Sequence, residues 1–103
     1  MSKGYWIVHV DVHDPEGYQK YLAANPAAFE KYGAKFLVRG GRFESPAGSA
    51  RERNVVIEFK DYDTALACYH SPEYQHAIAE RGDSAELDVL IIEGYDGPQP
   101  ADD

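Results

Sequence analysis

The chain is short of basic residues: it has 10 Lys and Arg against 18 Asp and Glu among 103 residues, a formal net charge of -8. Proteins that bind nucleic acids need Lys and Arg to displace counterions from the phosphates, and anionic membrane surfaces attract the same basic residues. The deficit of basic residues therefore argues against nucleic acid and against a membrane surface as partners.

Long apolar stretches are missing as well. No apolar run exceeds about five residues, whereas a membrane-spanning helix needs about 18 or more. The first residues reach His9 and Asp11 before the apolar stretch of a signal peptide could form. We therefore expect a cytoplasmic protein. Cys68 is the single cysteine, which excludes an internal disulfide and a metal site made of cysteines alone.

What the chain does have is apolar and aromatic content, 44% and 13% of its residues, which is too much for a disordered chain. A length of 103 residues is near the common size of one domain. We expect a single domain over residues 1–103, with its folded part at about residues 3–95. Residues 96–103 contain Gly97, Pro98, Pro100 and three acids, and we expect a loose acidic tail there.

Four short segments rich in β-branched and aromatic residues are typical of strands. They are residues 5–12, 36–40, 55–59 and 87–92. Asp14-Pro15-Glu16 predicts a helix start, and that helix ends at Gly33 with a kink or a restart at Pro26. A second helical segment starts at about residues 61–63, is interrupted at Ser71-Pro72 and ends at Gly82.

This order of elements, β-α-β-β-α-β, predicts the ferredoxin-like α+β fold, a four-stranded antiparallel sheet with two helices on one face. The alternation of side chains along the strands leaves Tyr5, Ile7, Leu37 and Val56 on the opposite face of the sheet. Such a face is too apolar to be left in water, and a second copy of the chain is its simplest cover. We therefore expect a homodimer formed through the sheet face.

Five motifs occur together, in order, over nearly the whole chain. They are Gly4-Tyr5-Trp6-Ile7-Val8, Asp14-Pro15-Glu16, Phe36-Leu37-Val38-Arg39-Gly40-Gly41, Val56-Ile57-Glu58-Phe59 and Tyr69-His70-Ser71-Pro72-Glu73-Tyr74-Gln75. Over about residues 3–95 the chain resembles the bacterial family catalogued as domain of unknown function 1330. The resemblance implies a ferredoxin-like protomer that pairs through its sheet as a dimeric α/β barrel. The wider superfamily includes cofactor-free monooxygenases of the antibiotic-biosynthesis type and members that only bind or assemble, so the resemblance implies no particular activity.

Arg39 is the first candidate site residue. Alternation along its strand places it on the face away from the helices, within reach of Glu58 on the neighbouring strand. Its guanidinium could hold the carboxylate, phosphate or enolate of a ligand. It could instead neutralise Glu58 or Glu93 across the dimer, because a half-buried charge needs a partner. Both roles stay open.

His70 and several tyrosines are further candidates. His70 lies where Ser71-Pro72 interrupts the helix, and it could serve as a general base or simply be a surface residue at a helix end. Tyr18 and Tyr74 fall at helical spacing and could line a pocket between the helices and the sheet. Aromatic side chains in such a stripe often belong to the core instead.

A metal site is a weaker alternative, and we expect no metal and no cofactor. His9, Asp11 and His13 alternate along one predicted strand, so their side chains share a face, and imidazole and carboxylate groups are ligands for Zn or Fe. In the simpler interpretation these three residues form a polar strand end, with His13 in the turn before the helix.

Two hypotheses for the function follow. In the first, the protein is a cofactor-free enzyme in which Arg39 stabilises an oxyanion and His70 or a tyrosine moves a proton. In the second, it binds a small molecule or a partner without catalysis. Residues 35–53 carry five bases and two acids, including Arg42, Arg51 and Arg53, so a small anionic organic compound can find a positive site there despite the net charge.

Overall fold

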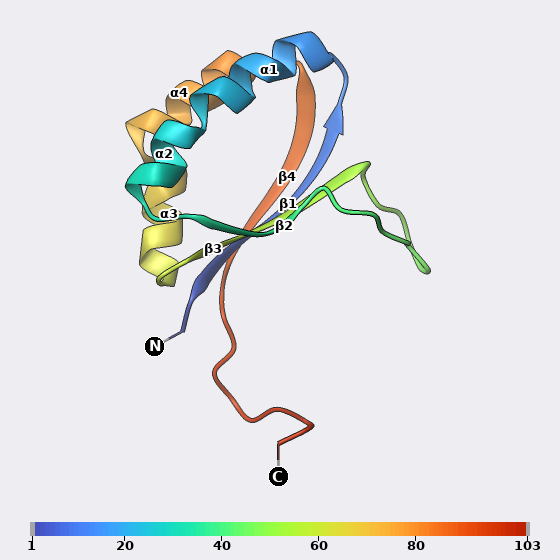
Figure 1. The fold of residues 1–103 in the computed structure, drawn as a ribbon, viewed down its shortest axis with the longest axis vertical. Helices are drawn as coiled ribbons and strands as arrows, with labels where there is room; N and C mark the ends of the chain where they lie inside the picture. Colours follow the sequence, from blue (N-terminus) through green and yellow to red (C-terminus); the bar gives the residue numbers. More distant parts are fainter. Residues whose placement is uncertain (1, 103) are drawn as a thin grey trace.

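The computed structural model describes residues 2–102 (Figure 1). Along the chain its elements are β1 (Gly4–Val12), α1 (Pro15–Ala24), α2 (Pro26–Lys31), β2 (Lys35–Arg39), β3 (Arg53–Phe59), α3 (Tyr62–His70), α4 (Pro72–Arg81) and β4 (Ala85–Glu93). The four strands form one antiparallel sheet in the order β2-β3-β1-β4, and all four helices cover the same face of it. The predicted ferredoxin-like α+β fold is confirmed.

Each predicted helical segment consists of two helices, because a proline starts the second of each pair. Pro26 begins α2 and Pro72 begins α4, so the chain restarts the helix at both positions. The side chains of Asp61 and Ser71 cap α3 and α4 by accepting hydrogen bonds from backbone N–H groups three residues later, at 2.8 and 3.1 Å. Asp14 occupies the N-cap position of α1, but its side chain accepts no capping bond.

The core lies between the helices and the sheet, and Trp6 of β1 is at its centre. The Trp6 ring is 1% exposed, and its centroid lies 4.9 to 5.7 Å from the rings of Phe29, Phe59, Tyr69 and Tyr74. Its indole N–H donates a hydrogen bond of 2.9 Å to the backbone carbonyl of Ala65. One side chain thereby connects β1 to β3, α2, α3 and α4.

The start of β1 approaches α3 closely at Gly4. A Cβ atom at this position would collide with the backbone carbonyl of Asp61. Glycine is therefore required there because two segments of backbone pass too close for any side chain.

The sequence-based placement of Arg39 is wrong, because β2 contains a bulge. Phe36 pairs with Ile57 of β3, but Val38 pairs with Val56 and Arg39 with Val55, so one residue of β2 is unpaired between Phe36 and Val38. The extra residue reverses the alternation, and Phe36 and Arg39 both face the helices. Glu58 pairs instead with Tyr5 and Lys35.

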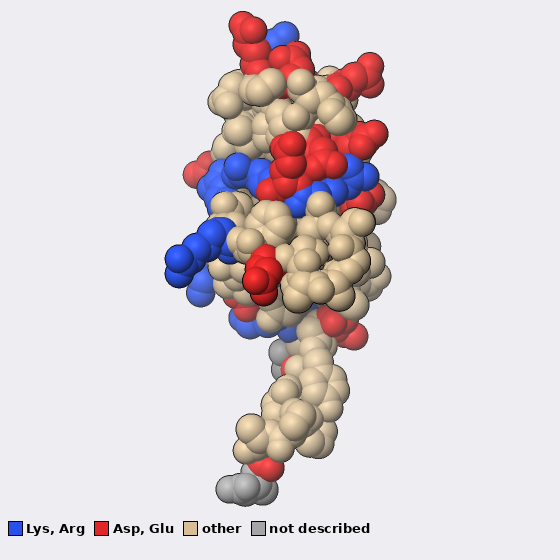
Figure 2. Space-filling view, turned by 90° about the vertical axis from the view of Figure 1, so that its right-hand side faces the viewer, with Lys and Arg blue, Asp and Glu red and all other residues tan. Residues whose placement is uncertain are grey.

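The other face of the sheet is open and largely apolar in the protomer. Its large side chains include Val38, Leu90 and Ile92, which are 44%, 54% and 44% exposed, together with the partly buried Tyr5, Ile7 and Val56. We call these six residues the outer face. Figure 2 looks onto the side opposite the helices, where a wide area without charge is interrupted by an acidic side chain and bounded by a band of mixed charge.

Arg51 contacts acidic side chains of both β1 and β4. Its guanidinium donates to Asp11, Glu86 and Asp88 at 2.8, 3.0 and 2.9 Å. Asp11 also accepts from the backbone N–H of Glu52 at 2.9 Å, and this bond together with Arg51 lowers the pKa of its carboxyl. Arg51 is thus engaged by carboxylates of its own chain.

Two segments extend from the body of the molecule. Residues 40–52 form the loop between β2 and β3, and residues 94–102 continue from β4 as an arm directed away from the helices (Figure 1). Within the arm, the Tyr95 hydroxyl donates to the Pro98 carbonyl at 2.8 Å, and Ser2 near the N-terminus donates to Asp96 of the arm. Asp103, the last residue of the predicted tail, lies outside the described residues.

Candidate functional site

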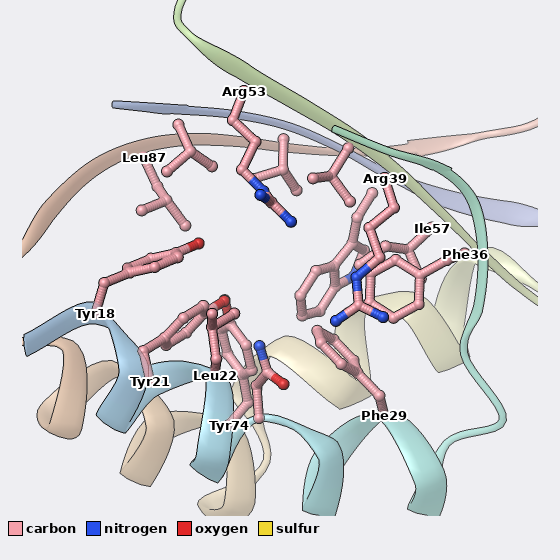
Figure 3. Close-up of a pocket in the computed structure, with 15 residues that line it drawn as sticks. Tyr18, Tyr21, Leu22, Phe29, Phe36, Arg39, Arg53, Ile57, Tyr74 and Leu87 are labelled. Carbon is pink, nitrogen blue, oxygen red and sulfur yellow. The ribbon is translucent and has the colours of Figure 1, made fainter. Parts of the chain in front are cut away.

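A small cavity lies between the helices and the sheet, on the side of the sheet that the core occupies (Figure 3). Its volume is about 40 Å³, and the whole depression, including its mouth, holds about 420 Å³ of space not filled by protein atoms. Aromatic and aliphatic side chains make most of the wall. The polar lining residues are Tyr18, Tyr21, Asn25, Arg39, Arg53 and Tyr74. We call this space the inner cavity.

Two arginines point into the inner cavity from the sheet. Arg53 descends from the start of β3 and Arg39 from the end of β2, where its guanidinium carbon lies 4.2 Å from the centroid of the Phe36 ring (Figure 3). Within residues 2–102, neither guanidinium has a carboxylate within 4.0 Å. Two cations that share a partly enclosed space without an acidic partner make this cavity a candidate site for an anion.

Three tyrosines face the arginines from the helices. Tyr18 and Tyr21 come from α1 and Tyr74 from α4, and the hydroxyls of Tyr21 and Tyr74 share a hydrogen bond of 2.5 Å. Burial raises the pKa of all three phenols. They are therefore neutral near neutral pH, and they can donate hydrogen bonds but not act as bases.

The raised pKa values predict that the protein loses stability in alkali. The unfolded chain releases the tyrosine protons at about pH 10, whereas the folded chain holds them to higher pH. The stabilising effect is therefore complete below pH 10 and is lost as the pH rises toward the folded pKa values. Urea unfolding followed by circular dichroism between pH 8 and 11 should show a falling free energy of unfolding. Tyr21→Phe should flatten this decline, and Tyr95→Phe, at a residue that is 69% exposed, should not.

Of the candidates from the sequence, the structure brings together Arg39, Tyr18 and Tyr74 and leaves out His70 and Glu58. His70 is exposed at the end of α3, where its ring lies 5.3 Å from that of Tyr69, and it does not line the inner cavity. Glu58 lies on the opposite face of the sheet. Among the described residues, the lining contains no His, Asp or Glu, so the inner cavity offers cations and neutral donors but no side chain suited to act as a base near pH 7.

The alternative metal site at His9, Asp11 and His13 does not assemble. His9 shares a 2.6 Å hydrogen bond with the side chain of Asn54, Asp11 is occupied by Arg51 and Glu52, and His13 lies 3.9 Å from Glu86. In the part of the chain from Ser2 to Asp102, no group of three or more His, Cys, Asp or Glu side chains could hold a metal ion.

Cys68 lies in the core at 0% exposure, and its Sγ donates a weak hydrogen bond of 3.8 Å to the backbone carbonyl of Ala28. Burial raises the pKa of its thiol to about 12, so almost no thiolate exists at neutral pH. A buried, protonated thiol of this kind is unreactive.

Sequence reasoning did not single out Arg53 or Asn25 as site residues, and it named Arg53 only as part of the basic stretch of residues 35–53. A signal for Arg53 was present, because it precedes Val55 by two residues and so shares the helix-facing side of β3 with Val55, Ile57 and Phe59. Asn25 carried no such signal. It is 6% exposed at the junction of α1 and α2, where the sequence predicted a kink or a restart of the helix but no site residue.

The fold and the inner cavity define a small ferredoxin-like α+β protein with a candidate anion-binding site between its helices and its sheet. The chain belongs to the family described as Domain of unknown function (DUF1330), which it matches over residues 3–95. The resemblance seen in the sequence motifs is thus confirmed. None of the curated proteins matches this chain.

Solved structures of similar fold come from several bacteria. A protein of unknown function from Rhodopseudomonas palustris shares 15% identity, with 93% of this chain and 85% of that one covered and a TM-score of 0.71. SnoaB, a cofactor-independent oxygenase from Streptomyces nogalater, shares 13% identity over 100% of both chains with a TM-score of 0.59. A dimeric protein of unknown function and ferredoxin-like fold from Bacteroides fragilis shares 16% identity, with 88% of this chain and 95% of that one covered and a TM-score of 0.51. At these identities the likeness establishes the fold alone.

The helices from Ser2 to Asp102 are too short and too polar to span a bilayer.

Proposed function

We propose that this protein binds a small anionic organic molecule in the inner cavity. The observation that carries the proposal is the pair of guanidinium groups, Arg39 and Arg53, which face the cavity without a carboxylate partner among the described residues. A carboxylate accepts two parallel hydrogen bonds from one guanidinium, which gives both affinity and orientation. The neutral phenol of Tyr18 can donate a further hydrogen bond to the same oxygen atoms.

The test compares an anion with its neutral counterpart. Benzoate should bind, as measured by isothermal titration calorimetry, and benzamide should bind at least about tenfold more weakly, because a charge-assisted hydrogen bond contributes about 1.5–3 kcal/mol. Arg53→Gln keeps the length and polarity of the side chain but removes its charge, and it should weaken benzoate binding about tenfold or more.

Arg42→Gln is the matched control, since Arg42 is exposed in the loop between β2 and β3, outside the cavity lining. It removes the same charge from the same basic stretch of sequence and should leave the affinity for benzoate within about twofold. Equal losses in the two variants would mean that general charge, rather than the cavity, attracts the anion. Absence of any benzoate binding that depends on Arg53 would refute the proposal.

We further propose that the protein works as a homodimer that pairs through the outer face. This is supported by the exposed apolar side chains on that face, because a patch of this kind in a soluble protein marks an interaction site. The dimeric, ferredoxin-like protein from Bacteroides fragilis supports it as a precedent for the fold. A cytoplasmic location stays a prediction.

A second candidate is cofactor-free catalysis, for which the structural likeness to the cofactor-independent oxygenase SnoaB is the supporting observation. Arg39 and Arg53 would stabilise an enolate or another oxyanion of the bound molecule. A base would have to come from outside the described cavity lining, since His70 lies elsewhere. Deuterium exchange at the acidic carbon of acetoacetate tests this role, because enolate stabilisation would accelerate the exchange in the wild type but not in Arg53→Gln.

A further inference from the structure

A second depression lies directly beside the inner cavity, on the outer side of α2 and β2. It has a volume of about 310 Å³ and is lined by Asn25, Pro26, Phe29, Glu30, Ala34, Phe36 and Arg39. We call it the outer groove. Four of these residues, Asn25, Phe29, Phe36 and Arg39, also line the inner cavity. The two spaces are therefore separated by a wall that is one side chain thick.

Arg39 is the least tightly packed part of this wall. Phe29 is 7% exposed and Asn25 is 6% exposed, so both are fixed by packing. Arg39 is exposed, and its guanidinium rests on the face of the Phe36 ring without a carboxylate partner among the described residues (Figure 3). A stacking contact at an exposed site contributes only about 0.5–1 kcal/mol, so a ligand can displace it at little cost.

The volumes of the two spaces indicate that an organic ligand would need Arg39 to move aside. The inner cavity alone, at about 40 Å³, accommodates about three water molecules. Sites for small organic molecules usually measure about 300–1,000 Å³. The outer groove, at about 310 Å³, has enough space, but Arg53 and Tyr18 line only the inner cavity, so an organic ligand that contacts them needs both spaces.

We propose that the inner cavity and the outer groove form one binding site, gated by Arg39, for an aryl carboxylate with a fused or extended ring system. This inference rests on the proposed function and names the ligand class. The carboxylate binds Arg53 and Tyr18 in the inner cavity. The ring takes the place of the Arg39 guanidinium on the face of Phe36, beside the edge-to-face pair of Phe36 and Phe29, and its far end occupies the outer groove. Arg39 turns aside to admit the ring and then covers it, because a guanidinium stacks on aromatic faces.

The walls favour an aromatic ring over an aliphatic chain. Phe29 and Phe36 line the two spaces together with the planar side chain of Arg39. Pairs of aromatic rings gain about 0.5–1.5 kcal/mol beyond the area that they bury. Glu30 at the rim of the outer groove disfavours a second negative charge at the far end of the ligand. We therefore expect a monoanion rather than a dicarboxylate.

The experiment compares 2-naphthoate with benzoate by isothermal titration calorimetry. Since its second ring reaches the outer groove, 2-naphthoate should bind at least about tenfold more tightly, the effect of about 1.4 kcal/mol. Ala34→Leu places a larger side chain in the outer groove and should reduce this preference to less than about threefold. The same substitution on the exposed surface of α3, Ala67→Leu, is the control and should leave the preference unchanged. In NMR spectra, 2-naphthoate should shift the backbone amides of Ala34 and Glu30, and benzoate should not.

The outcomes separate this inference from the proposed function. If benzoate binds in a manner that depends on Arg53 but 2-naphthoate gains nothing, or if Ala34→Leu leaves the preference intact, the outer groove takes no part in binding and the combined site is refuted. If 2,6-naphthalenedicarboxylate binds as tightly as 2-naphthoate, the assignment of a monoanion is wrong. If no carboxylate binds through Arg53, the proposed function fails, and this inference fails with it.

Discussion

Trp6→Ala should lower the free energy of unfolding by about 3–5 kcal/mol, the range typical of removing a buried Trp or Phe side chain. The reason is the position of the Trp6 ring, which contacts one strand and three helices besides its own strand. A small domain has only about 5–15 kcal/mol of stability in total. We therefore expect the variant to be largely unfolded at 37 °C or to melt far below the wild type.

Circular dichroism is the appropriate measurement, because Trp6 is the only tryptophan and its replacement removes the fluorescence signal. Trp6→Phe is the matched variant. It keeps an aromatic ring among Phe29, Phe59 and Tyr74 but loses the hydrogen bond to the Ala65 carbonyl, which contributes about 1 kcal/mol. A loss below about 1 kcal/mol in Trp6→Ala would contradict the central role of this residue.

The sequence allowed the fold to be predicted because its local signals agree with one another. The buried alternation Trp6, Val8 and Val10 in β1 matches that of Val55, Ile57 and Phe59 in β3, and both confirm the predicted inward face. Prolines at the starts of α1, α2 and α4 marked real helix boundaries. Gly33 and Gly82, at φ of 67° and 51°, follow the helices that they were expected to end.

The site could be predicted only in part, since it depends on one residue of register. The bulge between Phe36 and Val38 turns Arg39 from the outer face to the helix side, and nothing in the sequence around Leu37 marks it. Once Arg39 faces the helices, its predicted pairing with Glu58 becomes impossible and its neighbour becomes Arg53 instead. A period-two pattern carries no information about such an insertion, because the bulge is set by the pairing of β2 with β3.

The arginines of the basic segment, residues 35–53, have different surroundings in the folded protein. Arg51 belongs to the same stretch of sequence, but three carboxylates of β1 and β4 engage it at the edge of the outer face. Only Arg39 and Arg53 reach the inner cavity. The local excess of positive charge predicts an anion site in this region, and the binding test above checks that prediction. The excess alone did not identify which arginines would form the site.

Leu90→Glu should convert the proposed dimer to a monomer while leaving the protomer folded. Leu90 is 54% exposed on the outer face, opposite Ile7 of β1, so a carboxylate there remains hydrated in an isolated protomer and should change its stability by less than about 0.5 kcal/mol. In a dimer that pairs through this face, the same carboxylate would be buried without a partner. The cost of burying an unpaired charge is several kcal/mol, which weakens association by a factor of about 100 or more.

Light scattering after size-exclusion chromatography measures this outcome directly. At micromolar concentration the wild type should have twice the 11.5 kDa mass of the chain, and Leu90→Glu should have the mass of one chain with an unchanged circular dichroism spectrum. Phe43→Glu is the matched control, because Phe43 is also 54% exposed but lies in the loop between β2 and β3 rather than on the sheet. It should remain dimeric. A wild type that elutes at the mass of one chain, or a Leu90→Glu variant that stays dimeric, would mean that the outer face is not where two copies meet.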